Sequence, residues 1–98
     1  MRTELRDIIA KLDLMKKPIR ENYKAEIVGL FGSYSRGEQG PDSDLDIIAR
    51  FCEGANLFHL SGLSIFLREQ LQIPVDVVSE RAVREELRER IYREAVML

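Results

Sequence analysis

Apolar side chains recur at helical spacing at the start of the chain. They alternate with charged residues, and they are Leu5, Ile8, Ile9, Leu12 and Met15. This spacing predicts an amphipathic helix whose apolar stripe covers a sheet. Pro18 suits the first turn of a second, short helix that ends near Lys24.

Three later runs are mostly apolar and have the length of strands, at residues 25–31, 44–51 and 75–78. A leucine stripe over residues 57–71, with Asn56 as a plausible N-cap, predicts a helix between the second and third runs. A strand reached through a helix lies parallel to the preceding strand in the same sheet. We therefore expect residues 44–51 and 75–78 to be parallel neighbours.

The last segment, residues 80–98, is predicted to form one helix. Three i,i+4 pairs are predicted on a solvated face, each worth roughly 0.2–0.5 kcal/mol: Glu80 with Arg84, Glu86 with Arg90, and Glu89 with Arg93. The expected core stripe consists of Val83, Leu87, Ile91 and Ala95. The fold class that follows is α/β (α+β), a small mixed β-sheet flanked by helices, in a single domain over residues 1–98.

The composition of the chain excludes several classes of function. The 98 residues suffice for one core, and 15 basic residues interspersed with 17 acidic ones give a net charge of -2. Direct nucleic-acid binding is therefore not expected. With no apolar stretch near the roughly 20 residues of a membrane span and no secretory signal, we expect a cytoplasmic chain without membrane contact. Single Cys52 and single His59 exclude a disulfide, a zinc cluster and a Ser-His-Asp triad.

The chemistry is concentrated in residues 32–48, which read GSYSRGEQGPDSDLDII. Residues i and i+2 of a strand share a face, roughly 6.5–7 Å apart, so Asp44 and Asp46 should project together. Asp76 lies in the third run, and a buried carboxylate there costs several kcal/mol without a compensating cation. Three converging carboxylates indicate a Mg²⁺ site that also takes phosphates. Alternatively, these aspartates form turns or sit on an exposed edge.

The Gly32-Ser33 pair allows a phosphate to approach the backbone where the first strand ends. Such pairs also make ordinary turns, so the pair alone is weak evidence. It is neither a P-loop nor a dinucleotide-binding fingerprint, because the required glycine spacing is missing. Arg36 could neutralise a phosphate or simply brace the acidic loop.

Taken together, these motifs resemble the nucleotidyltransferase superfamily related to DNA polymerase β. The match rests on Gly32-Ser33, ten intervening residues, Asp44-Leu45-Asp46 and the distant Asp76. The Arg36-Gly37 and Ser43-Asp44 features are similar to the minimal nucleotidyltransferase (MNT) family. This resemblance implies a polymerase β-like nucleotidyltransferase fold and transfer of a nucleoside monophosphate from ATP or another nucleotide, with Mg²⁺ as cofactor.

The resemblance also implies residue roles. Asp44, Asp46 and Asp76 would be catalytic residues and metal ligands, and the nucleotide would be held by Gly32, Ser33, Arg36 and Ser43. Two metal ions between such carboxylates can activate an attacking hydroxyl and stabilise leaving pyrophosphate.

Members of the MNT family are often antitoxins encoded beside HEPN-domain toxins, and some adenylylate a tyrosine of the toxin. The resemblance therefore implies AMP transfer from ATP to a partner hydroxyl. The alternative is a nonenzymatic, nucleotide-binding antitoxin that covers its partner. A small-molecule acceptor is disfavoured, because no second domain is available to form its pocket. The oligomeric state stays open.

Overall fold

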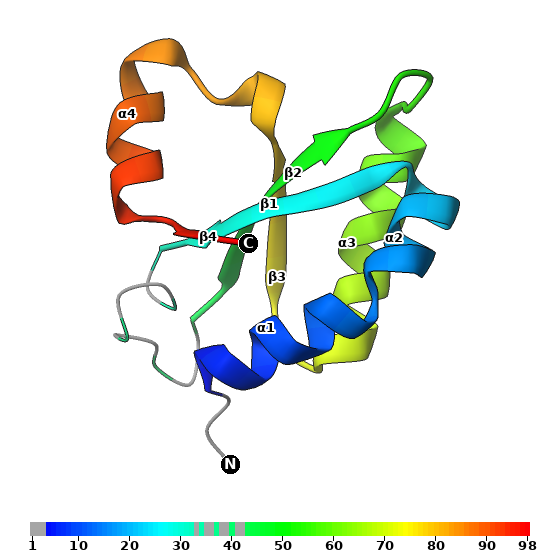
Figure 1. Ribbon diagram of the computed structural model, residues 1–98, viewed down its shortest axis with the longest axis horizontal. Helices are drawn as coiled ribbons and strands as arrows, with labels where there is room; N and C mark the ends of the chain where they lie inside the picture. The colour runs from blue at the N-terminus through cyan, green and yellow to red at the C-terminus, as the bar shows by residue number, and fades with distance from the viewer. Residues whose placement is uncertain (1–3, 33, 35–36, 38–39, 41–42) are drawn as a thin grey trace.

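The computed structural model describes residues 4–32, 34, 37, 40 and 43–98 (Figure 1). Its elements follow the chain as α1 (Leu5–Leu14), α2 (Lys16–Tyr23), β1 (Ala25–Phe31), β2 (Leu45–Phe51), α3 (Leu57–Leu71), β3 (Val75–Ser79), the 3-10 turn η1 (Glu80–Ala82), α4 (Glu85–Glu94) and β4 (Val96–Met97).

The sheet has the strand order β3-β2-β1-β4. Strands β1 and β2 are antiparallel, whereas β2 and β3 are parallel, as the helical connection between them predicts. Strand β4 adds an antiparallel edge to β1. The predicted fold class, a mixed sheet flanked by helices, is confirmed.

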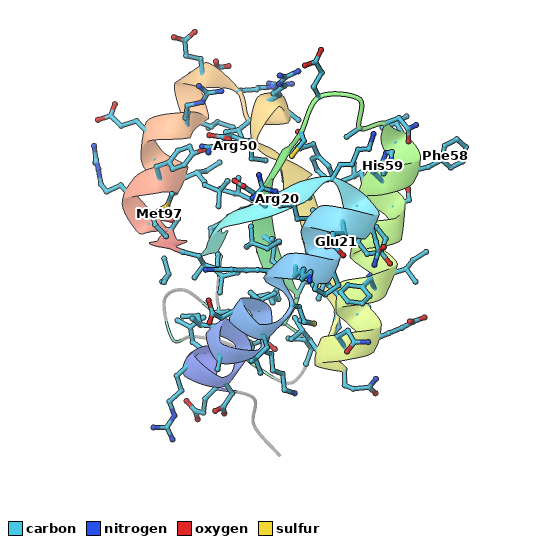
Figure 2. The ribbon with its side chains drawn as sticks, turned by 45° about the vertical axis from the view of Figure 1, so that its right-hand side comes forward. Arg20, Glu21, Arg50, Phe58, His59 and Met97 are labelled. Atoms are coloured by element: carbon cyan, nitrogen blue, oxygen red, sulfur yellow. The ribbon has the colours of Figure 1, made fainter. Side chains whose placement is uncertain are left out.

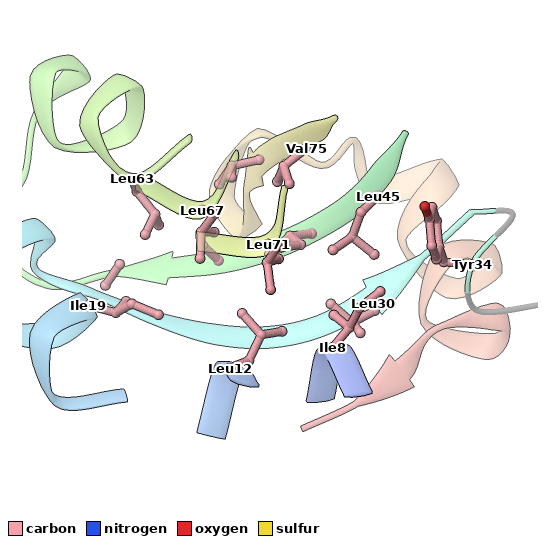
Figure 3. Close-up of a cluster of buried hydrophobic side chains, with 14 residues drawn as sticks. Ile8, Leu12, Ile19, Leu30, Tyr34, Leu45, Leu63, Leu67, Leu71 and Val75 are labelled. Atoms are coloured by element: carbon pink, nitrogen blue, oxygen red, sulfur yellow. The ribbon is translucent and has the colours of Figure 1, made fainter. Parts of the chain in front are cut away.

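The core lies between one face of the sheet and helices α1, α2 and α3. Alternation along β2 places Leu45, Ile47 and Ala49 on this face, and each is fully buried. Figure 3 shows how helix and strand side chains meet there, among them Ile8, Leu12, Ile19, Leu30, Leu63, Leu67, Leu71 and Val75. Since this face is occupied by packing, polar chemistry is confined to the other face and to the sheet ends.

A β-bulge in β1 decides which residues reach that other face. The pairing of β1 with β2 shifts between Ile27 and Gly29, which makes Val28 an extra residue. A bulge moves the alternation of side chains by one position. Leu30 therefore faces the core, where it is fully buried. Phe31, the last residue of β1, turns to the opposite face.

The prediction of one helix over residues 80–98 is wrong. The segment forms η1, then α4, then the short strand β4. All ten residues of α4 are described and none is buried, and Leu87, expected in the core, is 45% exposed. Val83, which precedes α4, is buried. Pairing of β4 with β1 satisfies backbone groups of an otherwise open edge, which a longer helix would leave exposed.

Helix α3 begins as predicted at Asn56. The Asn56 side chain accepts a hydrogen bond from the backbone N–H of Phe58, at 2.9 Å. His59 Nδ1 in turn accepts from the Asn56 N–H, at 2.9 Å, which closes a capping box. The single histidine is thus used at a helix terminus, close to the protruding Phe58 (Figure 2). Among the described residues, neither α3 nor any other helix has the length and apolar character to cross a bilayer.

Candidate functional site

The sequence-predicted aspartates lie at one end of the sheet, where β1 ends and where β2 and β3 begin. Phe31 is paired with Asp46, and Asp46 is paired with Asp76 on the neighbouring parallel strand. Paired residues of adjacent strands project from the same face, with backbones about 4.8 Å apart. Phe31, Asp46 and Asp76 thus form one row across three strands, which we call the carboxylate row.

Asp44 stands just before β2. The next residue, Leu45, donates its N–H to the carbonyl of Pro74 at 2.9 Å, which fixes the start of β2 against the start of β3. Asp44 and Asp76 border the same surface depression. The structure therefore brings all three predicted aspartates to one edge of the sheet, although Asp76 follows Asp44 by 32 residues in the sequence.

Gly32 follows β1 with a φ of +84°, a backbone conformation that residues with a side chain rarely adopt. A Cβ at this position would overlap the carboxylate of Asp46. Because Gly32 has no side chain, its backbone can adopt the left-handed conformation, and it can also lie close to the Asp46 carboxyl group. This is the kind of open backbone that the sequence predicts for phosphate approach.

The expectation that Asp76 is buried is wrong. Asp44 and Asp76 are exposed and Asp46 is half-buried. The parallel neighbour β2 covers only one side of β3, and Asp76 projects from the face that α3 does not cover. The cost of an unpaired buried charge therefore does not explain Asp76. What distinguishes this edge is the gathering of like charges on adjacent strands, which repel one another unless a cation intervenes.

The donor atoms at this edge are carboxylate oxygens, which Mg²⁺ prefers. Among the described residues, no three Asp, Glu, His or Cys side chains converge closely enough to hold a metal ion as they stand. The strands already hold Asp46 and Asp76 in register, so side-chain rotation would suffice to bring these two carboxylates together. With the side-chain-free backbone of Gly32 beside them, the residues fit a hard cation and an anionic ligand.

Of the three residues predicted to bind the nucleotide together with Gly32, Ser43 is the one within the part of the chain that the structure describes. Ser43 is half-buried, and its Oγ accepts a hydrogen bond from the N–H of Gly40 at 2.8 Å, within a local turn. Ser33 and Arg36 lie outside the described residues. Tyr34, by contrast, is 5% exposed and belongs to the core cluster, so its ring ties the segment after Gly32 to the body of the protein (Figure 3).

Beside Asp44 and Asp76 lies an open depression of about 610 Å³, which we call the β3 depression. Its other lining residues come from the end of α3 and from the turn into β3, namely Arg68, Gln72, Ile73, Pro74 and Val75. Arg68 is exposed, and its Nε donates to the carbonyl of Val75 at 3.0 Å. Sequence reasoning missed Arg68, because only the packing of α3 against β3 brings it near Asp76.

The opposite end of the same sheet face carries a different polar group, which we call the Arg50 clasp. Arg50 Nε donates to Glu80 Oε2 at 2.7 Å, and Tyr92 Oη donates to Glu80 Oε1 at 3.0 Å. The Arg50 guanidinium holds the pKa of the Glu80 carboxyl below its usual value, despite partial burial. Burial, reinforced by Glu80, raises the pKa of the Tyr92 phenol.

The predicted ion pair between Glu80 and Arg84 is wrong. Glu80 binds Arg50 rather than Arg84, because η1 places it beside β2 instead of on a helix. The predicted pair of Glu89 with Arg93 is confirmed, since Arg93 Nη2 lies 2.9 Å from Glu89 Oε1. For Arg90, predicted to pair with Glu86, the ion pair found among the described residues is with Glu94, at 4.0 Å between Arg90 Nε and Glu94 Oε1.

Comparisons with known proteins agree on one kind of fold. Residues 12–97 match the nucleotidyltransferase domain family. The protein adenylyltransferase MntA of Thermococcus cleftensis is 35% identical over 92 residues, which are 94% of this chain and 93% of that protein. A Methanocaldococcus jannaschii protein that carries a protein adenylyltransferase name is 36% identical over 81 residues, 83% of this chain and 91% of its own.

Solved structures are also similar. A minimal nucleotidyltransferase structure superposes with a TM-score of 0.83 at 36% identity, covering 99% of this chain and 98% of the other. A toxin-antitoxin structure with AMP-PNP superposes with a TM-score of 0.69 at 27% identity, covering 95% of this chain and 71% of the other.

Proposed function

The chain is an enzyme of the nucleotidyltransferase domain family, and from this premise we propose that it transfers AMP from ATP to a hydroxyl of a partner protein. The observation that carries the proposal is the register of Asp46 with Asp76 beside the close approach of Gly32 to Asp46. Carboxylates on adjacent strands and an accessible backbone are the two components that a metal-nucleotide complex needs.

In this proposal Asp44, Asp46 and Asp76 hold Mg²⁺. When bound, Mg²⁺ neutralises the phosphates and favours ionisation of the attacking hydroxyl. Gly32 and Ser33 hold the β- and γ-phosphates, and Arg36 and Ser43 complete the nucleotide contacts. Because Ser43 already accepts a hydrogen bond from Gly40, its contribution would be to shape the turn or to offer its remaining hydrogen-bonding capacity.

The reaction is an in-line displacement at the α-phosphorus of ATP. A bond forms between the acceptor oxygen and this phosphorus, and the bond from phosphorus to the bridging oxygen breaks. Pyrophosphate leaves with that electron pair. The proton of the acceptor passes to the carboxylate of Asp76 and from there to solvent, which Asp76 can reach because it is exposed.

The partner proposed is a HEPN-domain toxin and the acceptor its tyrosine. A relative named as a protein adenylyltransferase supports AMP transfer to a protein, and a similar toxin-antitoxin structure that contains AMP-PNP supports a toxin as the partner. The HEPN domain and the tyrosine follow from the resemblance to the MNT family. A phenol with an ordinary pKa near 10 ionises more readily than an aliphatic alcohol. ATP is abundant in the cytoplasm, where we place the reaction.

The test is intact-mass spectrometry of the protein encoded beside this chain, which the proposal takes to be the HEPN-domain partner, after incubation with the chain, ATP and Mg²⁺. Each transfer should add about 329 Da, the mass of an AMP group. EDTA should abolish the mass increase, and so should Asp44→Ala. An unmodified neighbour that is nonetheless bound and silenced, by wild type and Asp44→Ala alike, would select the nonenzymatic antitoxin instead.

A further inference from the structure

We propose that the β3 depression is the acceptor subsite, which receives the phenol that is to be modified and the residues next to it. This inference rests on the proposed function and adds where the acceptor lies. Asp44 and Asp76 belong both to the predicted metal site and to the depression. An acceptor side chain seated there is therefore in contact with the residues that would act on it.

The direction of attack supports this location. In an in-line displacement, the attacking oxygen and the leaving oxygen lie on opposite sides of the phosphorus. Across the sheet the order is Gly32 after β1, then Asp46 on β2, then Asp76 on β3. If the leaving pyrophosphate lies at Gly32, the acceptor must approach from beyond Asp76. The β3 depression lies on that side, and no residue of β1 lines it.

The lining suits a phenol. Ile73, which is half-buried, and Pro74, which is exposed, offer apolar surface for a ring, while Asp76 can accept a hydrogen bond from its hydroxyl. Arg68 borders the same space, and its planar guanidinium is anchored through Nε to the carbonyl of Val75. An anchored guanidinium can stack on an aromatic ring with little loss of side-chain entropy.

Access is also open. Among the described residues the sheet ends at β3, so a partner segment can reach the depression without displacing a strand. The volume of about 610 Å³ falls within the range of roughly 300–1,000 Å³ of ordinary ligand sites. The partner can therefore hold its own acceptor hydroxyl in position, while this small domain supplies the surface next to Asp76 on which the acceptor side chain rests.

The first test measures initial rates of AMP transfer to the HEPN-domain neighbour for Arg68→Gln, with Arg68→Lys as the conservative variant. We expect Arg68→Gln to raise the KM for the neighbour about tenfold, equivalent to about 1.4 kcal/mol. The KM for ATP and kcat should stay within about twofold. Arg68→Lys should recover part of the loss. Arg81→Gln, an exposed arginine at the other end of the sheet, is the matched control and should leave both KM values unchanged.

A second measurement uses the unmodified chain. N-acetyltyrosine amide is titrated in the presence of AMP-PNP and Mg²⁺, and backbone amide shifts are followed by NMR. The amides of Gln72, Ile73 and Val75 should move, whereas that of Arg81 should not. N-acetylserine amide should cause smaller changes, because it lacks the ring.

The outcomes separate the two proposals. If the wild-type chain transfers no AMP, the proposed function has failed, and the NMR titration alone decides whether phenols bind in the depression. If transfer occurs but Arg68→Gln raises the KM for ATP and not that for the neighbour, the depression is a nucleotide subsite. Unchanged KM values, or shifts confined to residues outside the depression, would equally overturn the acceptor subsite.

Discussion

The two ends of one sheet face differ in their charges: one end gathers charges of the same sign, and the other pairs opposite charges. At one end the carboxylate row and Asp44 place negative charges together, on strands held in register. At the other end the Arg50 clasp pairs each charge, with Arg50 on Glu80 and the Tyr92 hydroxyl completing the group. Strand β2 contributes to both ends, through Asp46 at one and Arg50 at the other, but its partner at the first is β3, whereas its partners at the second are η1 and α4.

Paired charges satisfy one another, and their role can be structural. The Arg50 clasp links β2 to η1 and α4, a segment whose helix buries no residue of its own. Asp44, Asp46 and Asp76, by contrast, carry charges of one sign at one edge of the sheet, and a cation bound there would be attracted by all three. In the proposed function, the carboxylate end is the site of the chemistry and the clasp end supports the fold. Variants at five positions, Gly32, Asp46, Gly54, Asp76 and Glu80, test this difference between the two ends.

The largest effect is expected for Asp46→Asn and Asp76→Asn. Each removes the charge of one proposed metal ligand, and the rate of AMP transfer should fall about 100- to 1,000-fold, as for other groups that stabilise a transition state electrostatically. Stability should change by less than about 0.5 kcal/mol for Asp76→Asn, because Asp76 is exposed. Transfer assays and urea unfolding measure the two quantities. If the Asp76→Asn variant transferred AMP at the wild-type rate, Asp76 would have no role in the site.

A smaller effect, on stability and activity together, is expected for Gly32→Ala. Gly54 is its matched control at the clasp end, since Gly32 and Gly54 have φ values of +84° and +88°. A left-handed conformation costs a residue with a side chain about 1–2 kcal/mol. At Gly54 the added Cβ meets only the Lys24 ammonium, at 3.2 Å, whereas at Gly32 it overlaps the Asp46 carboxylate.

Both alanine variants should therefore lose stability in urea, and Gly32→Ala should lose more. Only Gly32→Ala should also lose transfer activity, by at least about tenfold, since it displaces a proposed metal ligand. Equal losses of activity in the two variants would mean that the approach of Gly32 to Asp46 has no role in the reaction.

The smallest effect is expected for Glu80→Gln, which breaks the Arg50 clasp. Because the pKa of Glu80 is lowered in the folded state, its charge stabilises the fold above the unfolded-state pKa. This stabilisation is lost as the pH falls through the folded-state pKa. The variant should melt at a lower temperature than wild type near pH 7, by a few degrees at most, and the difference should vanish in acid. Transfer activity should be unchanged. A deficit that is independent of pH would show that packing, not charge, holds η1.

The sequence by itself determined most elements and the family. Periodicity located α1, α3 and the strands β1, β2 and β3, and the helical connection predicted that β2 and β3 are parallel. These features depend on local spacing and on general rules of chain connection. The resemblance to nucleotidyltransferases, drawn from the Gly-Ser and Asp-x-Asp motifs, is confirmed by the family match over residues 12–97.

The tertiary structure alone decided the bulge at Val28, the strand β4 and the exposure of Asp76. Each depends on which strand or helix lies opposite, and a local pattern does not contain that information. The apolar spacing of residues 83–95 suits a helix, yet β1 offers an unpaired edge that the end of the chain occupies. The proximity of Arg68 to Asp76 is likewise a tertiary feature, since only the packing of α3 on β3 brings the two residues to one depression.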